Sequence, residues 1–242
     1  MSPVGSRLAR LRDDLRTALA MPRVEVVASR GGALEEAMFA YLSRPHPRYR
    51  IVANKSFGAA LLPLDEFDDV DEYLAPRRYV RRRARTASRR GYTTDLFDMD
   101  ERRSDLLAIH RSLPERQGQP ISASYLDPEA VYESDPAVQC LGVFHEDVVV
   151  AYSELRYVGD VVTMNRLMGH GDHLDAGVMC LLMAGVVEHV KAVRPDTRYV
   201  FYDTFFGASD GLRTFKTHLG FRPHYVHWKR ELPVPATGVD AR

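Results

Sequence analysis

Residues 138–168 decide the fold of this chain and read VQCLGVFHEDVVVAYSELRYVGDVVTMNRLM. Apolar residues fill three segments of this stretch, and the pairs Glu146-Asp147 and Gly159-Asp160 separate them. Two-residue connections of this kind join neighbouring antiparallel strands. The stretch therefore predicts an antiparallel meander at the centre of the domain, with strands over residues 138–145, 148–158 and 161–168.

The segments after the meander predict the remainder of the same domain. Residues 174–193 are apolar almost all round a helix, so we expect a buried crossover helix there. Arg198–Thr204 then reads as a strand, Asp210–Leu219 as a short helix and Phe221–Leu232 as a last strand. A right-handed crossover places the strand after the long helix parallel to its neighbour. The predicted fold class is α+β, with a mixed, mostly antiparallel sheet flanked by helices.

A basic helix is expected upstream, from Pro76 to Arg90, with Gly91 as its stop. At 100° per residue, one arc of about 140° carries its arginines, and small apolar residues face the other way. We call the residues on that arc the arginine stripe: Arg77, Arg78, Arg81, Arg82, Arg85 and Arg89. Two interpretations stay open. The stripe binds an RNA backbone, or it is a solvated face neutralised by the acidic run within residues 65–72.

The N-terminal portion, residues 1–74, is predicted to be either a degenerate half or a part of the same domain. Its expected elements are a helix, a strand, a helix and two extended stretches, at Ser6–Leu19, Val24–Ala28, Ala33–Leu42, Arg50–Asn54 and Gly58–Leu64. Residues 75–232 form the main domain, in which a strand at Tyr92–Phe97 and a helix at Arg102–Leu113 precede the meander. Residues 233–242 are expected to be a mobile tail.

Composition indicates a soluble globular protein, because the 242 residues carry 33 basic and 33 acidic side chains and 45% are hydrophobic. The longest apolar stretch, Ala176–Val187, is shorter than the roughly 20 residues that cross a bilayer, and the N-terminus lacks the apolar core of a signal peptide. We therefore expect a cytoplasmic protein without a membrane partner. Cys140 and Cys180 have no ligand or disulfide spacing and are expected to be reduced core thiols.

The order of elements, the glycine-bearing turn between Met168 and Val178, and Leu219-Gly220-Phe221 before the last strand are similar to the GNAT acyltransferase superfamily. The likeness covers roughly residues 75–232. Two segments resemble the Fem peptidyltransferase branch, which takes an aminoacyl group from aminoacyl-tRNA. They are the basic helix and the pattern Gly211-Leu212-x-x-Phe215-Lys216-x-x-Leu219-Gly220-Phe221. The resemblance implies an enzyme that moves an acyl or aminoacyl group to an amine, either a small molecule or a peptide.

The resemblance also implies a donor site. Arg166-Leu167-Met168-Gly169-His170-Gly171 fits the GNAT turn whose N–H groups bind the pyrophosphate of coenzyme A. The implied donor-binding residues are Arg166, Gly169, Gly171 and Phe215. The competing interpretation is an ordinary turn, because the helix-capping residues Asp172 and Asp175 follow. Two donors stay open: acyl-CoA, as a co-substrate rather than a tightly bound cofactor, and aminoacyl-tRNA. The turn also holds His170 and His173, but no further ligand has a suitable spacing, so we predict no metal site.

Acyl transfer to an amine needs a base for the amine and a stabilised oxyanion. Lys216 occupies the position of a tyrosine acid in many GNAT enzymes, and the Fem-type likeness implies that it stabilises a phosphate or an oxyanion. Tyr202 and Asp203 lie at the end of the strand expected over Arg198–Thr204, and Glu154 lies within the strand expected over residues 148–158. These three residues are therefore candidate bases or acids. For each candidate, a side chain that simply faces solvent is the competing interpretation.

The candidate acceptor-binding residues lie in or before the polar loop 114–120: His110, Arg116 and Gln117. Ordinary loop residues are the competing interpretation for this group. No cysteine or serine has a neighbouring base, so direct attack is expected in place of a covalent intermediate. A second class of function stays open, in which a degenerate GNAT domain binds RNA or a protein partner through the basic helix.

Overall fold

The computed structural model describes residues 17, 19–47, 50, 53–116, 119–132, 135–206 and 208–231. Most of the predicted first helix, Ser6–Leu19, and the whole of the predicted tail, residues 233–242, lie outside these residues. Among the described helices, none is long and apolar enough to cross a membrane.

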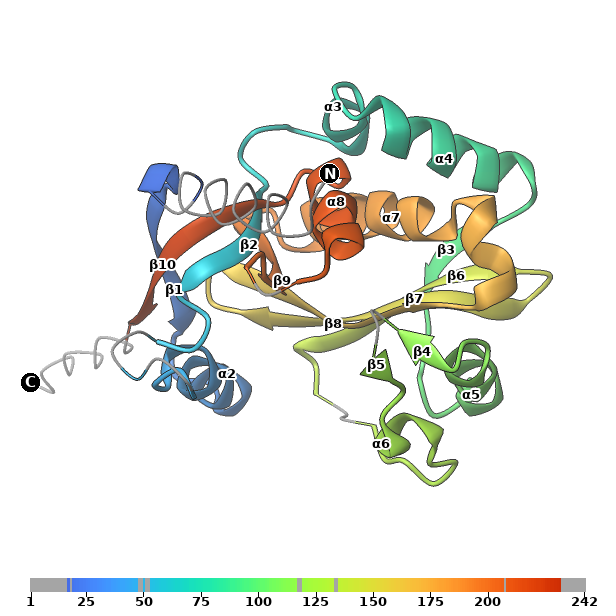
Figure 1. The fold of residues 1–242 in the computed structure, drawn as a ribbon, viewed down its shortest axis with the longest axis horizontal. Helices are drawn as coiled ribbons and strands as arrows, with labels where there is room; N and C mark the ends of the chain where they lie inside the picture. Colours follow the sequence, from blue (N-terminus) through green and yellow to red (C-terminus); the bar gives the residue numbers. More distant parts are fainter. Residues whose placement is uncertain are drawn as a thin grey trace, which may run out of the picture.

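One mixed sheet organises the described chain (Figure 1). Its strand order is β1-β10-β2-β9-β8-β7-β6-β3, and β8 pairs with β9 in parallel, as predicted from the crossover. The predicted meander is confirmed as β6, β7 and β8. The strands are β1 (Arg23–Ser29), β2 (Phe57–Pro63), β3 (Thr93–Leu96), β6 (Val138–His145), β7 (Val148–Val158), β8 (Val161–Gly169), β9 (Tyr199–Thr204) and β10 (Arg222–Arg230).

Helices cover both faces of this sheet (Figure 1). On one face lie α3 (Val70–Leu74), α4 (Arg78–Arg89), α7 (Val178–Val193) and α8 (Asp210–His218). On the other face lie α2 (Ala33–Ser43), α5 (Arg103–Arg111) and α6 (Ala123–Leu126). The largest apolar core fills the space between α7 and the sheet, and α4 packs on the outer side of α7 through Val80, Ala84 and Ala87. The expected α+β architecture is therefore confirmed. A short hairpin of β4 (Glu115–Arg116) and β5 (Gln119–Pro120) leads from α5 to α6.

Two local expectations were wrong, and one helix was not predicted. The long helix was expected from residue 174, but the 3-10 helix η1 (Gly171–Ala176) comes first, and α7 begins after Gly177. Gly177 has φ 95°, and a Cβ there would lie 2.6 Å from a backbone oxygen of α4, so the chain turns sharply at this point. Asn54 lies in a turn, where an extended stretch was expected. The acidic run overlaps the start of α3, which was not predicted, and its Asp69 side chain caps that helix by accepting the Glu72 N–H.

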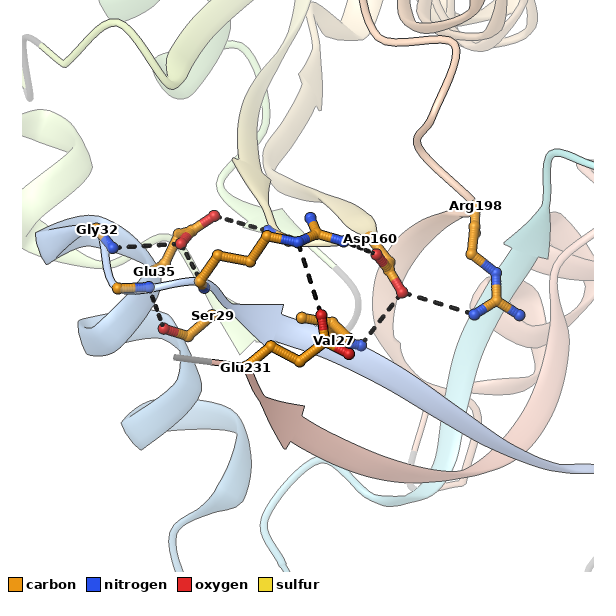
Figure 2. A network of polar contacts seen from close by, with 10 residues as sticks. Val27, Ser29, Gly32, Glu35, Asp160, Arg198 and Glu231 are labelled. Carbon is orange, nitrogen blue, oxygen red and sulfur yellow. Dashed lines mark hydrogen bonds and ion pairs between the residues drawn. The ribbon is translucent and has the colours of Figure 1, made fainter. Parts of the chain in front are cut away.

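A polar network closes one end of the sheet (Figure 2). Asp160, in the turn between β7 and β8, accepts hydrogen bonds from the Val27 N–H and from Arg30, and it lies 3.5 Å from Arg198. Glu35 at the start of α2 accepts the N–H of the neighbouring Gly159 at 3.0 Å. Because β10, β2 and β9 separate β1 from β8 in the strand order, these contacts show that the sheet curls until β1 reaches the β7–β8 turn.

Candidate active site

The two parallel strands β8 and β9 separate soon after they begin. They pair only over Val161–Thr163 and Tyr199–Phe201, although β8 continues to Gly169 and β9 to Thr204. A cavity of about 480 Å³ occupies the opening on the α2 and α6 side and is lined by both strands, β7, α2 and α6. Unpaired strand ends beside a cavity are a place where an open sheet can bind a ligand.

The backbone is strained on both sides of this cleft. Arg166 on β8 has φ 45° and Asp203 on β9 has φ 50°, the left-handed region that side chains other than glycine rarely adopt. At Arg166 the pairing with β7 shifts register, so the strand bulges there. The other described non-glycine residues with positive φ, Glu146 and Asp147, form the tight β6–β7 turn. Strain of this kind costs about 1–3 kcal/mol per residue and tends to collect at functional sites.

Glu154 lies in the cleft and is buried, with 4% of its side chain exposed. Its Oε1 accepts a hydrogen bond from Arg156 Nε at 2.6 Å, and its Oε2 lies 3.2 Å from Arg166 Nε. The solvent-facing interpretation of Glu154 was therefore wrong. Because both carboxylate oxygens are held by guanidinium groups, Glu154 is better suited to orienting these arginines than to accepting a proton.

Asp203 faces the same cleft and is paired with a lysine that the sequence reasoning missed. Lys55 Nζ lies 2.5 Å from Asp203 Oδ1, and it also lies 5.7 Å from the centre of the Tyr41 ring. Burial is the largest single influence and lowers the pKa of Lys55, but the charge of Asp203, its hydrogen bond and the interaction with Tyr41 together raise this pKa overall. Lys55 follows β-bridge residue Ala53 in a turn, and no local pattern marks it as a cleft residue.

Lys216 approaches the end of β9 from the opposite face of the sheet. It is 1% exposed, its Nζ donates to the Thr204 carbonyl at 2.8 Å, and it lies 4.5 Å from the centre of the Tyr202 ring. Burial lowers the pKa of Lys216 to about 8. The solvent-facing interpretation of Lys216 was therefore wrong. Tyr202 and Asp203 both line the cavity, and Lys216 lies against the first of them while Lys55 pairs with the second.

The predicted pyrophosphate turn is closed by internal hydrogen bonds. The His170 N–H donates to Val150 O, the Gly171 N–H to Ser112 Oγ at 2.9 Å, and the Asp172 N–H to His170 Nδ1. Arg166 lies inside β8, and a Cβ on Gly169 would strike the side chains of Met179 and Leu174, so this glycine serves packing. The donor-binding roles expected of Arg166, Gly169 and Gly171 therefore do not fit this geometry.

The remaining candidate donor residue, Phe215, and the two cysteines pack in or against the protein interior. Phe215 is half-buried and packs against the main core. Among the described residues, no three histidine, cysteine, aspartate or glutamate side chains gather closely enough to hold a metal ion. Both cysteines are buried free thiols, as expected.

Two of the residues expected to bind the acceptor, His110 and Arg116, bond to other parts of the protein. His110 is 1% exposed, with Nδ1 2.6 Å from Tyr125 O and Nε2 2.7 Å from Tyr152 Oη, and burial lowers its pKa. Arg116 donates to the carbonyls of Gly169 and Ile109 and so ties β8 to α5. Neither side chain lines the cleft, which corrects both expectations. Gln117 lies outside the described residues.

The arginine stripe is confirmed as the outer face of α4, with one exception. Arg77 packs 4.4 Å from the centre of the Tyr73 ring and donates to Tyr73 O, and burial lowers its pKa. The acidic run bonds elsewhere, since Glu66 pairs with Arg222. The remaining stripe guanidinium groups have no ion pair or hydrogen bond within the described part of the chain: Arg78, Arg81, Arg82, Arg85 and Arg89. The neutralised-face interpretation therefore lacks the ion pairs it requires.

The sheet, its crossover helix and its divergent strands define a protein with the GNAT fold, and the predicted likeness to Fem-type proteins is confirmed at the level of the fold. FemX is similar over 69% of this chain and 59% of its own, with a TM-score of 0.55 and 14% identity. L-PGS from Bacillus licheniformis is similar over 70% of this chain and 58% of its own, with a TM-score of 0.48 and 15% identity. A GCN5-related N-acetyltransferase from Kribbella flavida is similar over 69% of this chain and 54% of its own, with a TM-score of 0.40 and 14% identity.

We base the fold assignment on FemX, since the other two TM-scores are below 0.5. The chain spans about three fifths of the length of FemX. Searches against protein-family models and against curated protein sequences give no match. At such low identity the similarity establishes the fold, and the chemistry has to be argued from the cleft.

Proposed function

We propose that this protein is an N-acyltransferase that moves an aminoacyl group from aminoacyl-tRNA to an amine in the cleft between β8 and β9. The observation that carries the proposal is the strained, polar opening at the ends of these strands, with the buried amine of Lys216 on one side and the Lys55–Asp203 pair on the other. The GNAT fold supports acyl transfer as the general class of reaction.

The reaction is a direct displacement at the ester carbonyl. The amine nitrogen forms a bond to the carbonyl carbon, the carbon–oxygen bond to the tRNA ribose breaks, and the ribose oxygen leaves as a hydroxyl. Asp203 takes the proton that the attacking nitrogen loses and returns it to the leaving oxygen, with Lys55 holding the carboxylate in place. Lys216 lies behind the end of β9, where its Nζ donates to the Thr204 carbonyl, and its positive charge stabilises the oxyanion from beside the cleft, without lining it.

Two observations favour aminoacyl-tRNA over acyl-CoA as the donor. The N–H groups that a pyrophosphate needs are engaged by Val150, Ser112 and His170. In addition, α4, which carries the stripe arginines, lies on the same side of the sheet as α8, which carries Lys216 (Figure 1). Among the described residues, no ion pair involves the stripe arginines Arg78, Arg81, Arg82, Arg85 and Arg89. A row of unpaired arginines can contact successive phosphates of an RNA backbone.

Binding of a mixed aminoacyl-tRNA pool and of acetyl-CoA, measured by calorimetry at two salt concentrations, tests the donor. We expect salt-sensitive tRNA binding and no saturable CoA binding. Glutamine substitution of Arg78, Arg82, Arg85 and Arg89 should weaken tRNA binding and reduce its salt dependence, because each lost phosphate contact lowers the slope by about 0.9. The matched control replaces Arg102 and Arg103, which already have carboxylate partners.

Transfer of a radiolabelled amino acid from the same pool to a mixture of amines tests the reaction itself. CoA binding without tRNA binding would overturn the proposed donor. Stripe-dependent tRNA binding without transfer to any amine would favour the second class of function, a GNAT-fold domain that binds RNA without catalysis.

A further inference from the structure

Arg166 is arranged to bind a ligand with its outer edge. Its Nε lies 3.2 Å from Glu154 Oε2, and its guanidinium carbon lies 5.7 Å and 5.3 Å from the ring centres of Tyr125 and Tyr132. The side chain is 32% exposed and lines the cleft. Its two terminal nitrogens have no hydrogen-bond partner among the described residues. A carboxylate at one end and two aromatic rings beside it thus fix the guanidinium and leave its outer nitrogens for the cavity.

The bulge in β8 provides this orientation. With φ 45°, Arg166 adopts a conformation that a regular strand does not allow, and the register shift opposite β7 gives it an extra position on the bulged strand. Arg156 on β7 holds the other oxygen of Glu154 through its Nε at 2.6 Å. The two guanidinium groups are therefore neighbours on one buried carboxylate.

The charge around the cleft favours an anion. The described side chains that line the cleft include three cations, Lys55, Arg156 and Arg166, and two carboxylates, Glu154 and Asp203. Both carboxylates are already paired with these cations. A planar guanidinium with free outer nitrogens binds carboxylate or phosphate oxygens in a bidentate manner.

We propose that Arg166, with Arg156 beside it, binds an anionic oxygen group on the acceptor, so the acceptor is an amine that also carries a carboxylate or a phosphate. That this ligand is the acceptor rests on the proposed function. That the site binds an anion rests on the geometry around Arg166 alone. The cleft opens on the α2 and α6 side, and the stripe on α4 lies on the other side of the sheet (Figure 1). The acceptor and the RNA donor then approach the strand ends from opposite faces.

Ligand-detected NMR with matched probes tests the site. The probes are a mixture of free L-amino acids against the corresponding amino acid amides, and phosphoethanolamine against ethanolamine. We expect at least one anionic probe to bind, and its uncharged counterpart to bind roughly tenfold more weakly or worse. The anionic probe that binds distinguishes a carboxylate from a phosphate. Equal binding of the charged and uncharged members of both pairs would overturn the proposal without any variant.

Substitution then locates the site. Arg166→Asn removes the guanidinium with a residue that tolerates positive φ, and it should abolish the preference for the anionic probe. The matched control is Arg102→Asn, because Arg102 is 33% exposed, pairs with Asp147 and lies 5.7 Å from the Phe144 ring centre, but lies outside the cleft. Thermal unfolding checks that both variants fold. If Arg166→Asn does not fold, Arg166→Lys, which keeps the positive charge but lacks the planar guanidinium, must weaken binding of the anionic probe.

An unchanged preference in a folded Arg166→Asn protein would overturn the anion site. Anion binding that depends on Arg166, without acyl transfer to any probe, would refute the proposed function and keep the site. Transfer to charged and uncharged amines at equal rates would keep the function and refute the site. The two proposals therefore fail in distinguishable ways.

Discussion

Replacing Lys216 with methionine tests the chemistry and the energetics of the cleft together. Burial lowers the pKa of Lys216 from 10.5 to about 8, so its proton binds less tightly in the folded protein than in the unfolded chain. This difference corresponds to about 3 kcal/mol of folding free energy. The unfolded chain binds more protons between pH 8 and 10.5, so the contribution of Lys216 to stability rises with pH across that window.

At pH 7 two effects oppose each other in Lys216→Met. The variant removes the cost of burying a charge, but it also loses the hydrogen bond to Thr204 O and the contact with the Tyr202 ring, together about 2–4 kcal/mol. We therefore expect almost unchanged stability at pH 7. The wild type should then gain up to about 3 kcal/mol relative to the variant by pH 10.5. Transfer activity should fall by roughly 100-fold or more, because the oxyanion loses its cation.

Urea unfolding of both proteins at several pH values from 7 to 10.5 measures the difference. The control is Lys229→Met on β10, since Lys229 is 46% exposed and pairs only at the surface with Glu25. A stability difference between wild type and Lys216→Met that stays constant over this pH range would refute the lowered pKa of the buried Lys216 amine. Full transfer activity in a folded Lys216→Met protein would refute the role of Lys216 in the reaction.

Two further predictions concern the network in Figure 2. Burial alone would raise the pKa of Glu35, but hydrogen bonds from the N–H groups of Gly159, Arg30 and Gly32 lower it overall. Glu35→Gln should therefore lower the free energy of unfolding by roughly 1 kcal/mol at neutral pH. In urea titrations this loss should disappear as the pH falls below about 4.5, and a loss that persists at pH 3 would contradict the prediction. Gly159→Ala should lower stability by at least roughly 2 kcal/mol in thermal unfolding, because φ is 52° and the new Cβ would lie 2.2 Å from Val27 O. Gly211→Ala is its control, since nothing lies within 4 Å, and an equal loss there would contradict the steric argument.

The elements of the fold were predictable where local chemistry decides them. Gly159-Asp160 and Glu146-Asp147 mark tight turns, and β6 and β7 begin and end at the predicted residues. The start of α7 was not predictable, since Gly177 is required by a backbone oxygen of α4, a contact between residues far apart in the sequence. Sequence patterns also leave the curl of the sheet undetermined, because it depends on contacts such as Val27 with Asp160.

The cleft was predictable only in part. Lys216 and Asp203 follow from the likeness to a known family, but their burial and partners depend on tertiary structure. Arg156 follows Glu154 by two residues on the same strand, but a polar pair on a strand usually faces water, so the sequence does not indicate that the two side chains bond to each other in a buried site. No sequence pattern marks Lys55 as a cleft residue, because its partner Asp203 is distant in the sequence and the two meet only in the folded protein.

The position of β10 has a consequence for how this protein is made. Strand β10 follows the other described strands of the sheet along the chain, yet it lies between β1 and β2, which precede the rest. Until β10 arrives, both early strands have edges without partners, and exposed strand edges promote aggregation. Completion of the sheet therefore has to wait until residues 222–230 have been synthesised.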